Sequence, residues 1–140
     1  MPWTLETIHP LFVHFPIALF STGLIIDILS RLWKSYEEEL DPVGLWIMGM
    51  ALLSSPFTAL TGVFAYIKQG TFSEFLNFYH GILAIISIFI FSLLFWVRIE
   101  FQLELRYSIM KRNIYLFIQI LSTSLLFYAA HLGAIAAERI

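Results

Sequence analysis

Four long runs of apolar residues divide the chain, and short polar connections separate them. The runs cover residues 11–33, 43–67, 78–97 and 114–137. About 20 helical residues cross the ~30 Å hydrocarbon layer of a membrane, so each run is long enough to span it. A transmembrane β-barrel would need segments of about ten residues with alternating polarity, which the sequence lacks. The pattern predicts an all-α integral membrane protein, with residues 1–140 forming a single four-helix up-down bundle with short loops.

Composition supports a membrane location and excludes several classes of protein. Hydrophobic residues make up 59% of the chain and charged residues 13%, with a mean hydropathy of +0.82, whereas about a quarter of the residues in a soluble domain are charged. The net charge is −2 and the basic residues form no patch, so no nucleic-acid partner is expected. The absence of cysteine excludes disulfides, thiolate metal sites, iron–sulfur clusters and covalently attached c-type haem.

Basic residues are distributed unequally between the two ends of the predicted bundle. Six of them belong to the end that holds the first and third connections: Arg31, Lys34, Arg98, Arg106, Lys111 and Arg112. The opposite end carries Lys68 and Arg139. Because basic residues concentrate on the cytoplasmic side, both termini are expected to face the periplasm from a bacterial inner membrane.

All four histidines fall at the end that is predicted to face the periplasm. His9 and His14 begin the first span, His80 begins the third, and His131 lies near the end of the fourth. His14 and His131 lie one to two turns inside a span, where an imidazole without a partner is costly and is usually functional. His9 and His14 are about 140° apart around a helix, so both cannot face the bundle centre. Pro10 suits the first position of a helix, which would place His9 at the cap.

The first and third spans lie on a diagonal of such a bundle, which would set His14 opposite His80. Two facing imidazoles in apolar surroundings are what the iron of a b-type haem requires as axial ligands. We therefore expect haem b held by His14 and His80, with His131 as an alternate ligand or propionate partner and His9 as a surface or propionate partner. In another helix order, His80 and His131 would be the better pair. A copper or zinc site is the competing interpretation, because several imidazoles in one layer also fit those metals.

Small residues follow two of the histidines at helical spacing. The pattern His-x3-Ala-x2-Ser occurs in the first and third spans, which run in the same direction, and its offsets keep the three residues on one helix face. Such residues leave room for a flat macrocycle, and they equally allow close packing of membrane helices. A similar stripe on the second span includes Thr61, with Gly62 beside it. The candidate cofactor-binding residues are His9, His14, Ala18, Ser21, Thr61, Gly62, His80, Ala84, Ser87 and His131.

Other polar residues are expected to have structural roles. Asp27 is expected to pair with Arg31, four residues later on the same helix. The run at residues 37–39 is expected to form a solvated loop edge, and Gln119 to bond a neighbouring helix. No phosphate-binding loop, metalloprotease motif or serine elbow is present in the sequence, so no independent catalytic activity is expected.

The opening sequence and three later positions resemble a known family. The stretch HPLFVHFPIAL at residues 9–19, Thr61-Gly62, His80 and His131-Leu132-Gly133 are similar to the bacterial membrane family known as domain of unknown function 2231. The resemblance covers nearly the whole chain and implies a four-span domain without an established activity. Its relatives are joined to, or encoded beside, c-type cytochromes and Rieske-type proteins, which implies outward-facing electron transfer. Here Gly133-Ala134 stands where the family has Gly-Gly, and the family's Tyr-x-His-Gly tail is missing.

Three functions follow as expectations. The first is a b-type haem-binding electron-transfer subunit that works with a redox partner, such as a c-type cytochrome, on the periplasmic side. The second is a non-catalytic structural subunit of a larger respiratory or photosynthetic complex. The third is a membrane protein that binds copper or another metal.

Overall fold

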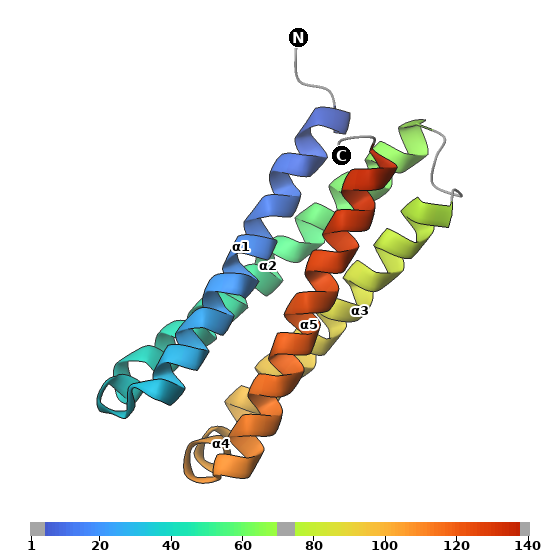
Figure 1. The fold of residues 1–140 in the computed structure, drawn as a ribbon. Coiled ribbons are helices and arrows are strands. Elements are labelled where there is room, and N and C mark those ends of the chain that lie inside the picture. The colour runs from blue at the N-terminus through green and yellow to red at the C-terminus, as the bar shows by residue number, and fades with distance from the viewer. Residues whose placement is uncertain (1–4, 70–74, 138–140) are drawn as a thin grey trace.

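Four long helices make up almost all of the structure. The computed structural model describes residues 5–69 and 75–137, with side chains from 8 to 68 and from 75 to 137. Within these ranges it contains helices and no strand (Figure 1). The long helices are α1 (Leu5–Leu32), α2 (Glu37–Gln69), α3 (Phe75–Glu100) and α5 (Ile109–Ala136), and the short ones are η1 (Lys34–Tyr36) and α4 (Gln102–Tyr107). Each long helix is long and apolar enough to cross a membrane, which confirms the predicted all-α bundle.

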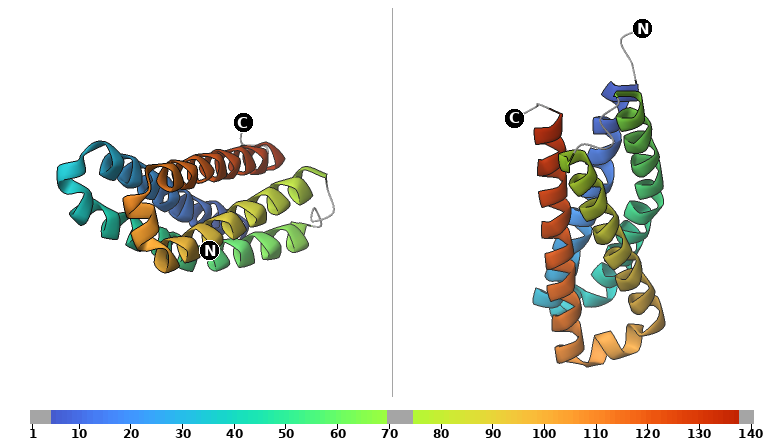
Figure 2. Two further views of the ribbon diagram at one scale, coloured as in Figure 1. Left: turned by 90° about the horizontal axis from the view of Figure 1, so that it is seen from below. Right: turned by 90° about the vertical axis from the view of Figure 1, so that its right-hand side faces the viewer.

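The bundle is built from two antiparallel hairpins. α1 packs along α2, and α3 packs along α5, while α1 also contacts α5 and α2 contacts α3. Figure 2 shows that α4 joins α3 to α5 at the end of the bundle that lies away from both termini. α1 and α3 are therefore diagonal neighbours, as the sequence predicted. Phe20 of α1 and Phe91 of α3 meet across this diagonal with stacked rings, whose centroids are 3.9 Å apart, and they form the centre of the apolar core.

α1 starts earlier than its apolar run, and this changes the position of the first histidine. The helix begins at Leu5, so Pro10 lies within it and His9 is a helical residue. The predicted cap at His9 was therefore wrong. Proline is tolerated here because it removes a donor only from the carbonyl of residue 6, close to the start of the helix.

A second proline in α1 is accommodated by a bond from the neighbouring helix. Pro16 leaves the Phe12 carbonyl without its helical donor. The hydroxyl of Thr58, on α2, donates to this carbonyl at 2.9 Å. Since lipid offers no hydrogen bonds, this side chain replaces a donor that water would supply in a soluble protein.

The bundle has an apolar outer surface and an interior that contains many polar groups. Large apolar side chains such as Leu53, Trp46 and Phe89 are exposed, and they form the surface that contacts lipid. Fully buried side chains include Ser30, Ser55, Ser87, Gln119 and Ser122. Small polar residues of this kind allow membrane helices to approach closely.

Candidate functional site

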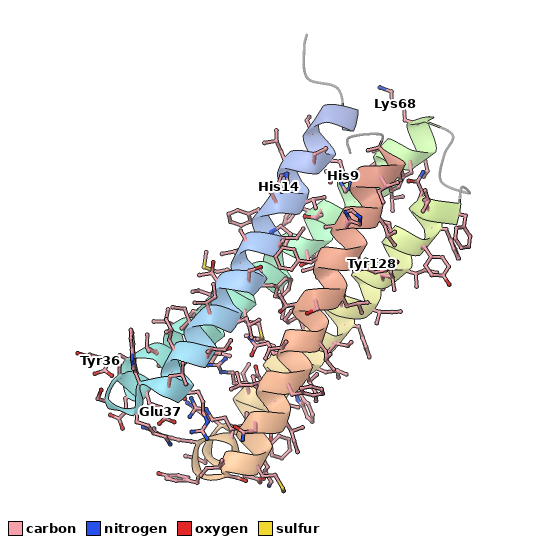
Figure 3. The ribbon with its side chains drawn as sticks, viewed as in Figure 1. His9, His14, Tyr36, Glu37, Lys68 and Tyr128 are labelled. Atoms are coloured by element: carbon pink, nitrogen blue, oxygen red, sulfur yellow. The ribbon has the colours of Figure 1, made fainter. Side chains whose placement is uncertain are left out.

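Two histidines and a tyrosine form one layer at the end of the bundle where α2 finishes. His9 of α1 and His80 of α3 are both half-buried, and Tyr66 of α2 lies between them. The Tyr66 ring centroid is 6.1 Å from that of His9 and 6.3 Å from that of His80, both in edge-to-face geometry. We call these three residues the histidine–tyrosine cluster. Figure 3 shows His9 at the same end as Lys68 and opposite Tyr36 and Glu37.

The Thr61-Gly62 pair of α2 holds the His9 ring. His9 Nδ1 lies 3.1 Å from Thr61 Oγ1. The Thr61 hydroxyl also lies 2.9 Å from the Thr58 carbonyl, and when it donates to that carbonyl its oxygen can accept from His9 Nδ1. A β-carbon at position 62 would lie 2.8 Å from His9 Cε1. The threonine therefore bonds the His9 ring, and the glycine leaves room for it.

α5 holds the His80 ring in the same manner. His80 Nδ1 lies 2.6 Å from the backbone carbonyl oxygen of Ala129. A carbonyl only accepts, so Nδ1 carries the hydrogen and the neutral ring has its lone pair on Nε2. A β-carbon at position 133 would lie 2.8 Å from His80 Cε1. Gly133 thus has the same role for His80 that Gly62 has for His9.

Two apolar cavities border the histidine–tyrosine cluster. One has a volume of about 440 Å³ and is lined by His9, His14, Tyr66 and His80, together with apolar residues of α1 and α5. The other has a volume of about 250 Å³, is also lined by His9, Tyr66 and His80, and extends inward to Phe20. The three residues of the cluster therefore form the boundary between the cavities.

The other two histidines occupy different positions. His14 is exposed on α1, although it lines the larger cavity, and His131 is exposed on α5 and lines neither cavity. The structure thus sets His9, and not His14, beside Tyr66 and across from His80, because a helix that includes both His9 and His14 turns only one of them inward. Among the described residues, no three His, Asp or Glu side chains gather in a group that could hold a metal ion. The copper or zinc interpretation stays a prediction.

The small residues that were predicted to line one site lie in different surroundings. Ala84 lines the smaller cavity, whereas Ala18 is exposed. The Ser21 hydroxyl donates to the Ile17 carbonyl at 2.7 Å, and the buried Ser87 hydroxyl donates to the Leu83 carbonyl at 2.9 Å. Both serines are therefore bonded within their own helices.

Sequence reasoning missed Tyr66 as a member of the site. Tyr66 lies four residues after Gly62, so the two share one face of α2. Its spacing from the Thr61-Gly62 pair was the available signal. The signal is weak, because a tyrosine near the end of an apolar span is also typical of an interface anchor.

A second polar site lies at the opposite end of the bundle. We call it the charged cluster, and its members are Asp27, Ser30, Glu37, Asp41, Arg98, Arg112 and Gln119. All of them are buried except Asp41, which is half-buried. Arg98 donates to Asp27 Oδ2 at 2.7 Å and to the Asp41 carbonyl at 2.7 Å.

Arg112 and Gln119 complete the bonds of the charged cluster. Arg112 pairs with Glu37, and it also donates to Ser30 Oγ at 2.9 Å and to Asp41 Oδ1 at 3.3 Å. Gln119 Nε2 donates to Asp27 Oδ2 at 2.8 Å. The charged cluster therefore connects both hairpins through side chains that are withdrawn from lipid and water.

The charged cluster corrects two predictions. Asp27 pairs with Arg98 rather than with Arg31, which instead donates to Asn113 at 3.4 Å. Asp27 points into the bundle, where the guanidinium of another helix reaches it. Glu37 is buried against Arg112 rather than solvated, because α2 already begins at this residue. The predicted bond from Gln119 to a neighbouring helix is confirmed.

Comparison with known proteins identifies the family. No curated protein and no solved structure matches the chain. The model of a family described as "Predicted membrane protein (DUF2231)" matches residues 5–140, which include all four long helices and all four histidines. The chain therefore belongs to the predicted membrane protein family DUF2231.

Proposed function

We propose that this protein is a b-type haem-binding electron-transfer subunit in which His80 and His9 ligate the iron. The observation that carries this proposal is the orientation of the two imidazoles. The His80 ring donates through Nδ1 to the Ala129 carbonyl, which in the neutral ring leaves the lone pair on Nε2, and His9 Nδ1 lies 3.1 Å from Thr61 Oγ1. Histidines that ligate metals commonly donate their other ring N–H to a carbonyl or another oxygen, which fixes the ring and raises its basicity.

The surroundings of the two imidazoles are chemically suited to haem. The cavities beside them are lined mainly by apolar side chains, and the larger one falls within the range of about 300–1,000 Å³ that is usual for ligand sites. The Tyr66 ring contacts both imidazoles edge-to-face, so ligation of one iron by both would require this ring to move. A bound haem supplies one-electron oxidation and reduction of its iron. The chain's own residues hold the ligands and exclude water.

The distribution of basic residues supports an orientation and a partner for this function. The excess of Lys and Arg lies at the end opposite the histidine–tyrosine cluster. By the positive-inside rule, the cluster then faces the periplasm from a bacterial inner membrane. A redox protein on that side, such as a c-type cytochrome, is the partner that this position favours.

Absorption spectra test the proposal. The full chain is purified in mild detergent, and its reduced-minus-oxidised spectrum and iron content are measured. Soret and α bands with bound iron are expected, and their absence from protein expressed with sufficient haem would overturn the proposal. Copper measured in the same sample tests the metal-binding alternative.

Histidine variants then identify the ligands. His80→Ala is expected to abolish the bands, and His9→Ala to convert a six-coordinate spectrum into a five-coordinate one. His131→Ala serves as the matched control that retains the wild-type spectrum, because His131 lines neither cavity, and His14→Ala tests the alternative ligand. Loss of the bands in His14→Ala, with no change in His9→Ala, would instead support the pair His14 and His80 that the sequence favoured.

The packing of Tyr66 favours a second candidate function. As the structure stands, the Tyr66 ring contacts both imidazoles edge-to-face and joins α2 to α1 and α3. Such an arrangement is suited to a structural subunit in which the histidine–tyrosine cluster holds the hairpins together. Co-purification with other membrane subunits without a chromophore, together with lower stability of His9→Ala and His80→Ala, would support this alternative.

A further inference from the structure

The charged cluster contains two buried oxygen atoms without a hydrogen-bond partner. They are Oδ1 of Asp27 and Oε1 of Gln119. Asp27 is 3% exposed and Gln119 is 0% exposed, so neither oxygen reaches bulk solvent. An acceptor that is buried without a donor is costly, most of all when it belongs to a carboxylate. The two side chains are direct neighbours, because Gln119 Nε2 donates to Asp27 Oδ2.

With the half-buried Asp41 included, the charges of the cluster do not balance. Three carboxylates, from Asp27, Glu37 and Asp41, face two guanidiniums, from Arg98 and Arg112. These five groups carry a net charge of −1, and one added proton makes them neutral. The exposed Lys34 approaches only Glu37, at 3.9 Å, from outside the cluster.

The position of Asp27 Oδ1 favours a proton over a metal ion. This oxygen lies so close to the α2 backbone that a β-carbon at Gly44 would be 2.1 Å from it. Hard cations in proteins are held by six or more oxygen ligands. Only Asp27 Oδ1 and Gln119 Oε1 are unpartnered here, and the described residues contain no group of three acidic or histidine side chains suited to a metal.

We infer that Asp27 Oδ1 is a proton-binding site within the membrane-spanning part of the protein. A hydronium ion from solution gives its proton to Oδ1 and leaves a water molecule, and the new O–H bond cancels the excess negative charge of the cluster. Arg98 keeps a charged partner in this state, because its Nη2 atom lies 3.7 Å from Asp41 Oδ1. This inference does not depend on haem binding at the other end of the bundle.

A small cavity connects Asp27 with the surface. Its volume is about 90 Å³, and its lining runs from Asp27 and Arg98 to the exposed residues Pro42 and Gln102. The charged and titratable groups around Asp27 come from every element packed there: Arg31, Lys34, Glu37, Asp41, Arg98, Arg106, Arg112 and Tyr115. Protons can therefore reach Asp27 from the end of the bundle that carries the α1–α2 turn and α4.

Infrared spectroscopy of aspartate-labelled protein tests the inference. The chain has two aspartates, Asp27 and Asp41, so ¹³C labelling of aspartate carboxyl groups reports on these two sites alone. Difference spectra of the full chain in lipid bilayers are recorded over about pH 5 to 8, where folded proteins are usually most stable. A carboxylic-acid C=O band that shifts on labelling and grows as the pH falls is expected. Absence of any such band would overturn the inference.

Variants assign the band to Asp27. It is expected to disappear in Asp27→Asn and to persist in Asp41→Asn, and the reverse pattern would overturn the inference.

Gln119→Leu retains both aspartates and removes a bond to Asp27 alone, so a change in band frequency assigns the band even if Asp27→Asn fails to fold. An unchanged frequency in this variant would count against Asp27. A spectral change that follows sodium or potassium concentration at fixed pH would show a metal cation instead.

Discussion

Small residues shape the space around the two inward-facing imidazoles. His9 and His80 each lie against a glycine, and each has Nδ1 within hydrogen-bonding distance of an oxygen atom. Neutral rings that are fixed in this way lose little entropy when Nε2 binds a ligand. The glycines are therefore as necessary to the site as the histidines.

Gly133→Ala tests this requirement. The new methyl group would lie 2.8 Å from His80 Cε1 and 2.9 Å from Nδ1, so the ring must move. We expect the bond to the Ala129 carbonyl to be lost, any haem bands to weaken, and the free energy of unfolding in detergent to fall by about 1–3 kcal/mol.

A nearby glycine provides the matched control. A β-carbon at Gly81 would meet nothing within 4 Å. Gly81→Ala is expected to leave the spectrum unchanged and to stabilise α3 by about 0.5–1 kcal/mol, because alanine loses less backbone entropy than glycine in a helix. Equal behaviour of Gly81→Ala and Gly133→Ala would contradict the proposed role of Gly133.

Gly44 has a corresponding role at the charged cluster. A β-carbon at this position would lie 2.1 Å from Asp27 Oδ1 and 3.1 Å from Arg98 Nη2. We expect Gly44→Ala to disrupt the pair of Asp27 and Arg98 and to lower the midpoint of thermal unfolding, measured by circular dichroism. Wild-type stability of Gly44→Ala would show that the carboxylate can move away from α2 at no cost.

At the scale of the helices, the charged cluster connects the two hairpins through buried polar groups. Arg98 of α3 is 8% exposed and bonds to groups of α1 and α2. Removing one partner of a buried pair typically costs about 3–5 kcal/mol, because the other charge stays buried without compensation. Arg98→Ala is therefore expected to lower the unfolding free energy by this amount, measured by denaturant titration in detergent micelles.

An exposed ion pair gives the comparison for Arg98→Ala. Lys111 and Glu104 form a pair whose side chains are both about half exposed. Such pairs contribute only about 0–1 kcal/mol. Lys111→Ala should therefore change stability by less than Arg98→Ala, and a similar loss in both would argue that Arg98 acts mainly through surface charge.

The sequence predicted the helices better than their contacts. Apolar runs of about 20 residues leave little choice except membrane-spanning helices, and their short connections force the up-down order. Contacts between distant residues leave no comparable local pattern. Asp27 and Arg98 are 71 residues apart, so the four-residue spacing to Arg31 gave the wrong partner.

The residues of the candidate site, too, were easier to predict from the sequence than their contacts. The residues of the DUF2231 resemblance included His9, Thr61-Gly62, His80 and Gly133, which do come together at one end. The choice between His9 and His14 depended on where α1 begins. Start positions are the part of a helix that sequence patterns locate least well, and here Pro10 gave the misleading signal.

For the molecule as a whole, the orientation in the membrane is open to direct measurement. The chain has no cysteine, so single-cysteine variants can be labelled without background. The positive-inside rule predicts that a cysteine introduced by Lys68→Cys reacts with a membrane-impermeant maleimide added outside intact bacterial cells. One introduced by Tyr36→Cys, at the opposite end, should react only after the cells are opened. The reverse result would place the histidine–tyrosine cluster at the cytoplasmic face.

The two hairpins divide the buried charges of the cluster by sign. All three carboxylates belong to α1 and α2, and both guanidiniums belong to α3 and α5. During synthesis the half of the chain with the three carboxylates leaves the ribosome first, and the two arginines of the cluster follow only with the second half. Charge compensation thus couples insertion of the later helices to completion of the earlier pair, and it disfavours association of two identical halves from different chains.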